Sequence, residues 1–183
     1  DLYLPYKPKR RTRAMIAREK GLEPLALLVL EEQADRNQIN NWLDAFQAGL
    51  SSPMPTDEIW QGVRDIFAEK VAEDAQTRAR IRQLTFQQGE FVSEVKPEFK
   101  ETTSKFETYY DFNENISKIQ PHRYLAIRRG EKEEILQARV QVQEGLTESA
   151  LQEIWLTKAN VDFRQELQVA LSVGYDRLLA PSI

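Results

Sequence analysis

Basic side chains crowd the first residues of the chain. Residues 1–20 hold seven Lys and Arg side chains against two carboxylates, a local charge of +5, whereas the whole chain carries −4 and the remainder therefore −9. Cations at this density bind phosphate without reading base sequence. The segment therefore predicts a nonspecific nucleic-acid contact, with these candidate residues: Lys7, Lys9, Arg10, Arg11, Arg13, Arg18 and Lys20.

The basic stretch could be the first part of a DNA-binding helix-turn-helix, and the segment that follows it tests this possibility. In such a reader the second helix presents polar side chains to base edges in the major groove. Here Gly21 and Pro24 lead into an apolar run at residues 25–30, in which no side chain can make a bidentate contact with a base. We expect this helix to be buried packing. The basic stretch before it either binds phosphate, is solvated, or pairs with acidic groups elsewhere.

A second, smaller basic cluster lies in a helix predicted from Pro121 to Gly130. It consists of Arg123, Arg128 and Arg129, with Lys132 following, and it is the weaker phosphate candidate. The single histidine of the chain, His122, lies at the start of the same helix. One histidine without cysteine does not make a usual zinc site, and no partner for general-base work accompanies it.

The remaining chemical motifs give no catalytic or metal site. The run DFNEN, residues 111–115, begins like a calcium loop, but Ile116 and His122 stand where Gly and Glu are required. No phosphate-binding loop, dinucleotide motif or nucleophile elbow is present. Carboxylates such as Asp74 share a helix with cations such as Arg78 at the i, i+4 spacing of a solvated face. We expect no catalytic residue, no metal, no cofactor and no enzyme activity.

The elements that position these residues are mostly helices. Thr12 is a plausible N-cap for a short helix that ends before Gly21. Further helices are expected over residues 40–48 and, as one long helix of about 50 Å at 1.5 Å per residue, over residues 56–88. Alternating apolar residues predict a short strand near 135–143. Helical spacing resumes from Thr147 to Ala180, where Asn160 or Gly174 are possible breaks.

These elements predict a mainly α fold, a multi-helical scaffold with one long central helix and a minor strand element. We expect two parts, residues 1–97 and 98–183. The chain has no cysteine, which excludes a disulfide framework and thiol catalysis, and no apolar run long enough to span a membrane. We expect a cytoplasmic location, no membrane partner, and a chain that is an interior piece of a longer protein.

Four blocks of the sequence resemble the bacterial transcription accessory protein family called Tex. They are YLPYKPKRRTRAMIAREKGLEPLA (residues 3–26), AEKVAEDAQTRARIRQL (68–84), FETYYDFNENISKIQPHRYLAIRRGEKEEIL (106–136) and YDRLLAPSI (175–183). The resemblance implies a mostly helical cytoplasmic protein that binds nucleic acid, RNA or DNA, and acts around transcription. It implies further modules outside this chain, among them an S1 domain, and it carries no catalytic residue onto any position here.

Three functions follow from these observations as expectations. The first is a non-catalytic helical scaffold of a Tex-like protein, which positions nucleic-acid-binding modules outside this chain. The second is direct, sequence-nonspecific nucleic-acid binding through the basic N-terminal segment. The third is a docking surface for a protein of the transcription machinery.

Overall fold

The computed structural model describes residues 11–31, 35–143, 145–156 and 163–182. The described residues are mainly helical with a small three-stranded antiparallel sheet, which confirms the predicted fold class. Contacts group the chain into two compact units, one formed by residues 1–78 and 151–183 and the other by residues 79–150. The C-terminal segment thus packs with the N-terminal one. The division at residues 97 and 98 stays a prediction about domains.

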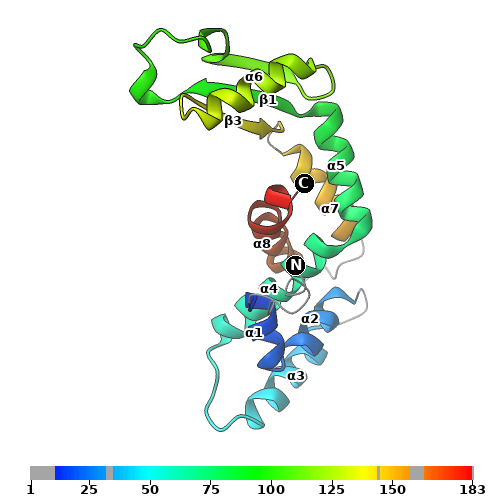
Figure 1. Cartoon of the computed structure of the whole chain (residues 1–183). Helices are drawn as coiled ribbons and strands as arrows, with labels where there is room; N and C mark the ends of the chain where they lie inside the picture. The colour runs from blue at the N-terminus through cyan, green and yellow to red at the C-terminus, as the bar shows by residue number, and fades with distance from the viewer. Residues whose placement is uncertain (1–10, 32–34, 144, 157–162, 183) are drawn as a thin grey trace, which may run out of the picture. The chain divides into compact units, whose positions relative to one another are not determined.

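The first unit is built from helices around α4 (Figure 1). Three of these, α1, α2 and α8, contact α4 directly. The helices that lie in this unit are α1 (Arg13–Glu19), α2 (Glu23–Leu30), α3 (Arg36–Ala48), α4 (Thr56–Glu73) and α8 (Arg164–Gly174), which is followed by a π-helical turn (Tyr175–Leu179) and a 3-10 turn (Ala180–Ser182). Two further helices, α5 (Ala75–Gln88) and α7 (Leu146–Trp155), have residues in both units.

The local signals at the start of the chain are confirmed. The Thr12 side chain accepts a hydrogen bond from the Met15 amide at 3.1 Å and so caps α1. Gly21 has φ +81°, a conformation that favours glycine, and it turns the chain into α2. The buried face of α2 is narrower than predicted, because Leu27 is 46% exposed while its neighbours Leu25, Ala26 and Val29 are buried.

Helix α3 begins earlier than predicted. The Asp35 side chain accepts from the Gln38 amide at 2.7 Å, and the Gln38 side chain accepts from the Asp35 amide at 3.0 Å. This reciprocal capping box starts the helix at Arg36 rather than Asn40. Only Ile39 is fully buried on α3, whereas the stacked rings of Trp42 and Phe46 are half-buried.

The prediction of one continuous helix over residues 56–88 is wrong, because α4 ends at Glu73 and α5 begins at Ala75. Asp74 between them has an extended backbone, with ψ 124°. Its carboxylate accepts from both the amide and the hydroxyl of Thr77, at 2.7 and 2.8 Å, as an N-cap of α5. Asp74, which the sequence analysis placed on a solvated helix face, is therefore a helix cap.

Close packing against α4 forms the core of the first unit. A Cβ at Gly62 would overlap the Leu22 side chain and lie 3.2 Å from the Ala17 Cβ, so glycine permits the approach of α1 and of the turn before α2. On α4, Phe67 meets the Trp155 ring edge-on, with ring centroids 5.5 Å apart. The large buried side chains of α4 are Ile59, Val63, Ile66, Phe67 and Val71.

The C-terminal helices follow the predicted pattern in part. The predicted break at Asn160 lies outside the described residues, and Gly174 is the last residue of α8. A Cβ at Gly174 would lie 3.1 Å from the Ala68 Cβ, so the end of α8 also packs tightly on α4. Arg64 of α4 donates to Glu166 of α8 at 2.5 Å and adds a polar contact to this packing.

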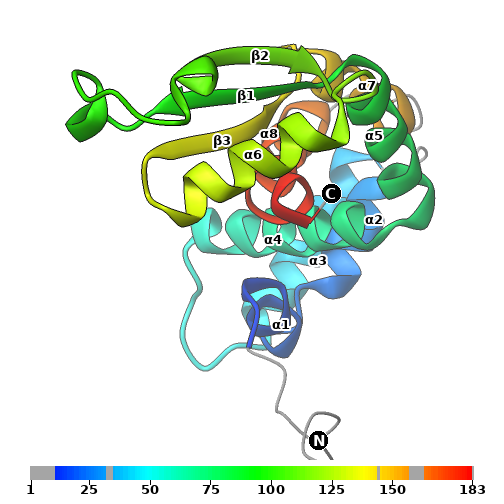
Figure 2. The same cartoon turned by 45° about the horizontal axis from the view of Figure 1, so that its top comes forward.

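The sheet and the helix α6 (Pro121–Lys132) lie entirely within the second unit. The strands are β1 (Glu90–Val95), β2 (Asp111–Asn115) and β3 (Leu136–Gln141), in the order β2-β1-β3. The strand predicted near 135–143 is thereby confirmed, and its partner is β1, with Ser93 opposite Ala138. Figure 2 shows α6 lying along the sheet.

One face of this sheet is apolar and the other is open. Phe91, Ile127 and Leu136 form the core between β1, α6 and β3, together with Phe106. The opposite face carries polar cross-strand residues, including Glu94 and Arg139, which pair through two hydrogen bonds of 2.8 and 2.9 Å. The apolar face of the sheet therefore packs on α6, and the opposite side of α6 is exposed to solvent.

Candidate nucleic-acid interface

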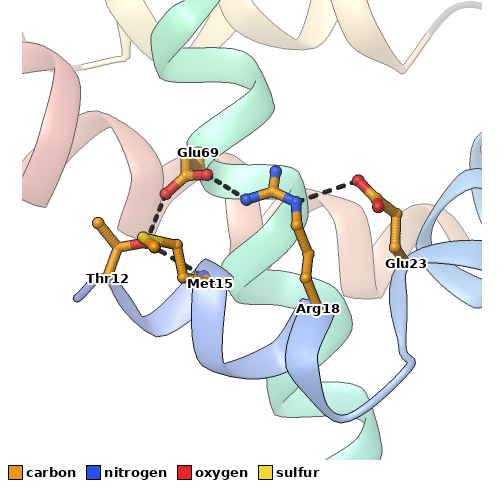
Figure 3. Close-up of polar contacts among 5 residues, drawn as sticks. All are labelled: Thr12, Met15, Arg18, Glu23 and Glu69. Atoms are coloured by element: carbon orange, nitrogen blue, oxygen red, sulfur yellow. Dashed lines mark hydrogen bonds and ion pairs between the residues drawn. The ribbon is translucent and has the colours of Figure 1, made fainter. Parts of the chain in front are cut away.

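The basic residues of α1 meet carboxylates of the neighbouring helices. Arg18 lies between Glu69 of α4 and Glu23 of α2, donating to both, with Nε 3.0 Å from the Glu23 carboxylate (Figure 3). The second oxygen of Glu69 accepts from the Thr12 hydroxyl at 2.8 Å. Glu69 is only 15% exposed, and its hydrogen bond raises the pKa of Arg18. The four side chains, Thr12, Arg18, Glu23 and Glu69, thus link α1 to α4 and α2 through hydrogen bonds and ion pairs.

Two more cations of the predicted segment are also paired. Arg11 pairs with Glu19 on the exposed surface, eight residues further along, and Lys20 donates to Glu58 of α4 at 2.6 Å. Arg13 is exposed and makes no ion pair within the described part of the chain. The remaining predicted residues of this segment, Lys7, Lys9 and Arg10, lie outside the described residues.

These pairs change what the N-terminal segment can do chemically. A phosphate that binds Arg18 or Lys20 must compete with a carboxylate already in place, which removes much of the gain from the contact. Arg13 makes no ion pair with a described side chain. It lines a groove of about 220 Å³ between α1 and α4, together with Ile16, Gln61 and the carboxylates of Glu58 and Asp65, so a phosphate in this groove would also meet negative charge.

The second predicted cluster lies on α6 and is more open. Arg123 donates to Glu114 of β2 at 3.0 Å, and Arg128 donates to Glu131 at 2.5 Å. Arg129 and the neighbouring cation Lys132 are exposed and make no ion pair with any described residue.

Two apolar side chains accompany these cations, and the sequence analysis did not assign them a site. Tyr124 is 42% exposed and Leu125 is 53% exposed. The Arg128 guanidinium lies over the Tyr124 ring, 6.0 Å from its centroid. The sequence signal was the position of Leu125 one turn before Arg129, on the side of the helix away from the buried Ile127.

Two carboxylates, Glu69 of α4 and Asp74 at its C-cap, take part in contacts that hold the fold together. Glu69 binds Arg18, and Asp74 caps α5, so the interpretation of these carboxylates as a solvated helix face is wrong for both. Within the described ranges, no group of three His, Cys, Asp or Glu side chains is placed to hold a metal ion. None of the described helices is both long and apolar enough to cross a bilayer.

Comparison with known proteins identifies relatives across the chain. The family model described as Tex central region-like matches residues 31–172. The uncharacterised protein YdcI of Bacillus subtilis is 34% identical over the whole chain, and the transcriptional accessory protein Tex of Neisseria gonorrhoeae is 41% identical over 74% of it. The human S1 RNA-binding domain-containing protein 1 is 28% identical over 97% of the chain.

The chain spans only a fraction of each relative's length: 26% of YdcI, 17% of the Neisseria protein and 19% of the human protein. The matched family segment nevertheless covers most of the chain, from the residue after α2 to within α8. It includes Glu69 of α4 and the α6 cations, whereas Thr12, Arg18 and Glu23 lie before it. This chain belongs to the Tex family, as a segment like the family's central region.

Proposed function

We propose that this segment is a non-catalytic helical scaffold, which positions nucleic-acid-binding modules of a longer Tex protein that lie outside this chain. The observation that carries the proposal is that three helices, α1, α2 and α8, all pack against α4. Gly62 and Gly174 allow close approach of α1 and α8, and ion pairs such as Arg18–Glu69 and Arg64–Glu166 hold the same two interfaces. A frame joined by both packing and ion pairs resists bending and suits a positioning role.

The relatives support the wider setting of this proposal. One carries the name transcriptional accessory protein Tex and another the name S1 RNA-binding domain-containing protein 1. We infer that the longer protein containing this chain acts in transcription and associates with nucleic acid in the cytoplasm. The chain itself supplies the frame.

The scaffold role is tested by weakening the α1–α4 contact in the full-length protein and measuring its RNA affinity. Gly62→Val should disturb the α1–α4 contact without removing any charged side chain and should still lower the RNA affinity of the full-length protein. Gly49→Ala is the matched control, since a Cβ there meets only ordinary contacts of 3.5 and 3.7 Å. Unchanged RNA affinity in a Gly62→Val protein whose α1 is shown by hydrogen exchange to be loosened would refute the scaffold role.

The non-catalytic part of the proposal has its own test. The chain is incubated with single- and double-stranded RNA and DNA, and strand cleavage is measured. We expect no cleavage above background. Cleavage that a point substitution within this chain abolishes would contradict the proposal.

Direct binding through the N-terminal segment is the second candidate, because Arg13 is exposed and makes no ion pair among the described residues. Replacing Lys9, Arg10, Arg11 and Arg13 with Ala should then weaken binding equally for all sequences and flatten its salt dependence. A titration that does not change would exclude this segment as the contact.

A further inference from the structure

We propose that the exposed face of α6 binds single-stranded nucleic acid, with its cations on the phosphates and Tyr124 against a base. This α6 face consists of Tyr124, Leu125, Arg128, Arg129 and Lys132. The proposal does not depend on the scaffold role, because it concerns a direct contact within the second unit.

The helix separates a buried side from this face. Ile127 is fully buried in the sheet core, and a Cβ at Gly130 would lie 2.5 Å from Leu136, so this side of α6 is pressed onto β3. Residues 125, 128, 129 and 132 are spaced by three and four positions and fall together on the opposite side. Leu125 and both unpaired cations, Arg129 and Lys132, therefore share one solvent-facing surface.

Within α6 the exposed charges are all positive, and the exposed carboxylates Glu133 and Glu134 follow directly after its end. The only carboxylate in α6, Glu131, is three-quarters buried and accepts from both Arg128 and the amide of Ala138, the latter at 3.1 Å. No exposed carboxylate interrupts the residues from Pro121 to Lys132. Residues 79–150 as a whole carry 11 basic and 12 acidic side chains. The positive charge of α6 is thus a local concentration on a nearly neutral unit, which favours an anionic ligand at this helix.

The two faces of the second unit also differ in charge. Facing away from α6, the sheet carries Glu90, Glu94 and Asp111, against the single cation Arg139, which Glu94 already binds. A polyanion is therefore repelled from the open sheet face and attracted to α6.

The aromatic ring indicates unpaired bases rather than a duplex or an acidic peptide. Tyr124 rests on Phe91 of the core, with ring centroids 5.4 Å apart, so the ring is held in place while 42% exposed. A held, exposed ring beside arginines is the surface on which single-stranded bases stack, while duplex bases are hidden from it. Arg128, over the same ring, adds a planar guanidinium on which a base can stack, whereas its pair with Glu131 leaves the phosphate contacts mainly to Arg129 and Lys132.

The test is a titration of the 183-residue chain against labelled oligo-uridine and oligo-thymidine strands, with the matched duplex and poly-glutamate as competitors. We expect micromolar or weaker affinity that falls steeply with salt. The variant pair Arg129→Gln with Lys132→Gln breaks no ion pair within the described residues. It should weaken binding about tenfold and reduce the slope of log K against log salt by about 1.4, or about 0.7 per lost contact.

The control removes the same charge elsewhere in the unit. Arg82→Gln with Lys100→Gln alters two exposed cations, on α5 and after β1, and should leave both affinity and salt slope nearly unchanged. Tyr124→Leu keeps an apolar side chain on Phe91 and should weaken single-strand binding about fivefold or more, with little effect on duplex binding.

Several outcomes would overturn the proposal. If the control pair weakens binding as much as the α6 pair, the attraction is diffuse and α6 is not its site. If Tyr124→Leu affects single strand and duplex equally, no base is stacked there. If poly-glutamate competes as strongly as oligo-uridine at equal charge, the face is a dock for acidic protein segments. A failure in these titrations leaves the scaffold test in the full-length protein unaffected, and the reverse also holds.

Discussion

Arg18 of α1 binds Glu69 of α4 across 51 residues of sequence, and Glu69 is the more buried partner. The guanidinium also reaches Glu23, while the free oxygen of Glu69 accepts from Thr12. A residue predicted to bind phosphate thus lies in the contact that holds α1 in place. Its removal leaves a largely buried carboxylate without its main partner, which is more costly than the loss of an exposed pair.

Arg18→Met is therefore expected to lower the free energy of unfolding by about 1–2 kcal/mol. A double-mutant cycle with Glu69→Gln should give a coupling of about 1 kcal/mol, measured by urea denaturation. Arg11→Met is the control, since Arg11 and Glu19 are each more than half exposed and should contribute less than about 0.5 kcal/mol. A coupling near zero for Arg18 and Glu69 would mean that packing alone holds α1.

Gly62→Ala tests that packing. The added Cβ would overlap the end of the fully buried Leu22 side chain and lie 3.2 Å from the Ala17 Cβ, so we expect a loss of about 1–3 kcal/mol in unfolding free energy. The better helix propensity of alanine offsets this by up to about 1 kcal/mol. Gly49→Ala, at the C-cap of α3 with ordinary φ, should change stability by less than about 0.5 kcal/mol. Equal stability of both variants would show that the α1–α4 contact is loose.

Much of the local structure could be predicted from neighbouring residues. The cap at Thr12, the turn at Gly21 and the helix that begins at Pro121 follow from side chains a few positions apart. The strand at residues 136–141 follows from its alternation. In each case the interaction that fixes the element lies within the element or next to it.

The break at Asp74 could not be predicted in this way. The apolar stripe continues through Val71 and Ala75 at helical spacing, so the local pattern favours an unbroken helix. Asp74 caps Thr77, and the Thr77 hydroxyl in turn accepts from the Trp155 indole at 3.0 Å, 78 residues further along. The partners of Arg18 and Lys20 are also distant in sequence, at 51 and 38 residues. The sequence thus predicts where cations lie, but not which of them are already bound.

Asp74→Ala tests whether the capped break at residue 74 is more stable than a continuous helix over residues 56–88. Loss of the cap should lower unfolding free energy by about 1–2 kcal/mol, because the Thr77 amide and its buried hydroxyl lose their acceptor. Asp74→Asn keeps an acceptor and should lose less. Thermal unfolding with circular dichroism measures both. Increased stability and helicity in Asp74→Ala would indicate that a straight helix over 56–88 is accessible to this chain.

The Glu94–Arg139 pair on the open sheet face predicts that the stability of the fold depends on pH in the acid range. The hydrogen bonds that Arg139 donates to Glu94 hold the pKa of Glu94 below its ordinary value and raise the pKa of Arg139. A carboxyl whose pKa is lower in the folded state stabilises the fold above its unfolded-state pKa. That stabilisation is lost as pH falls through the folded-state pKa.

Glu94→Gln should therefore be less stable than the wild type at neutral pH, and the difference should shrink as pH falls below about 4. Arg139→Met removes the same pair from the other side, so its stability relative to wild type should follow the same acid profile. Urea midpoints of the three proteins from neutral to acid pH measure this. A difference between wild type and Glu94→Gln that persists unchanged in acid would show that the two side chains are not paired in solution, since protonation of Glu94 removes the charge on which the pair depends.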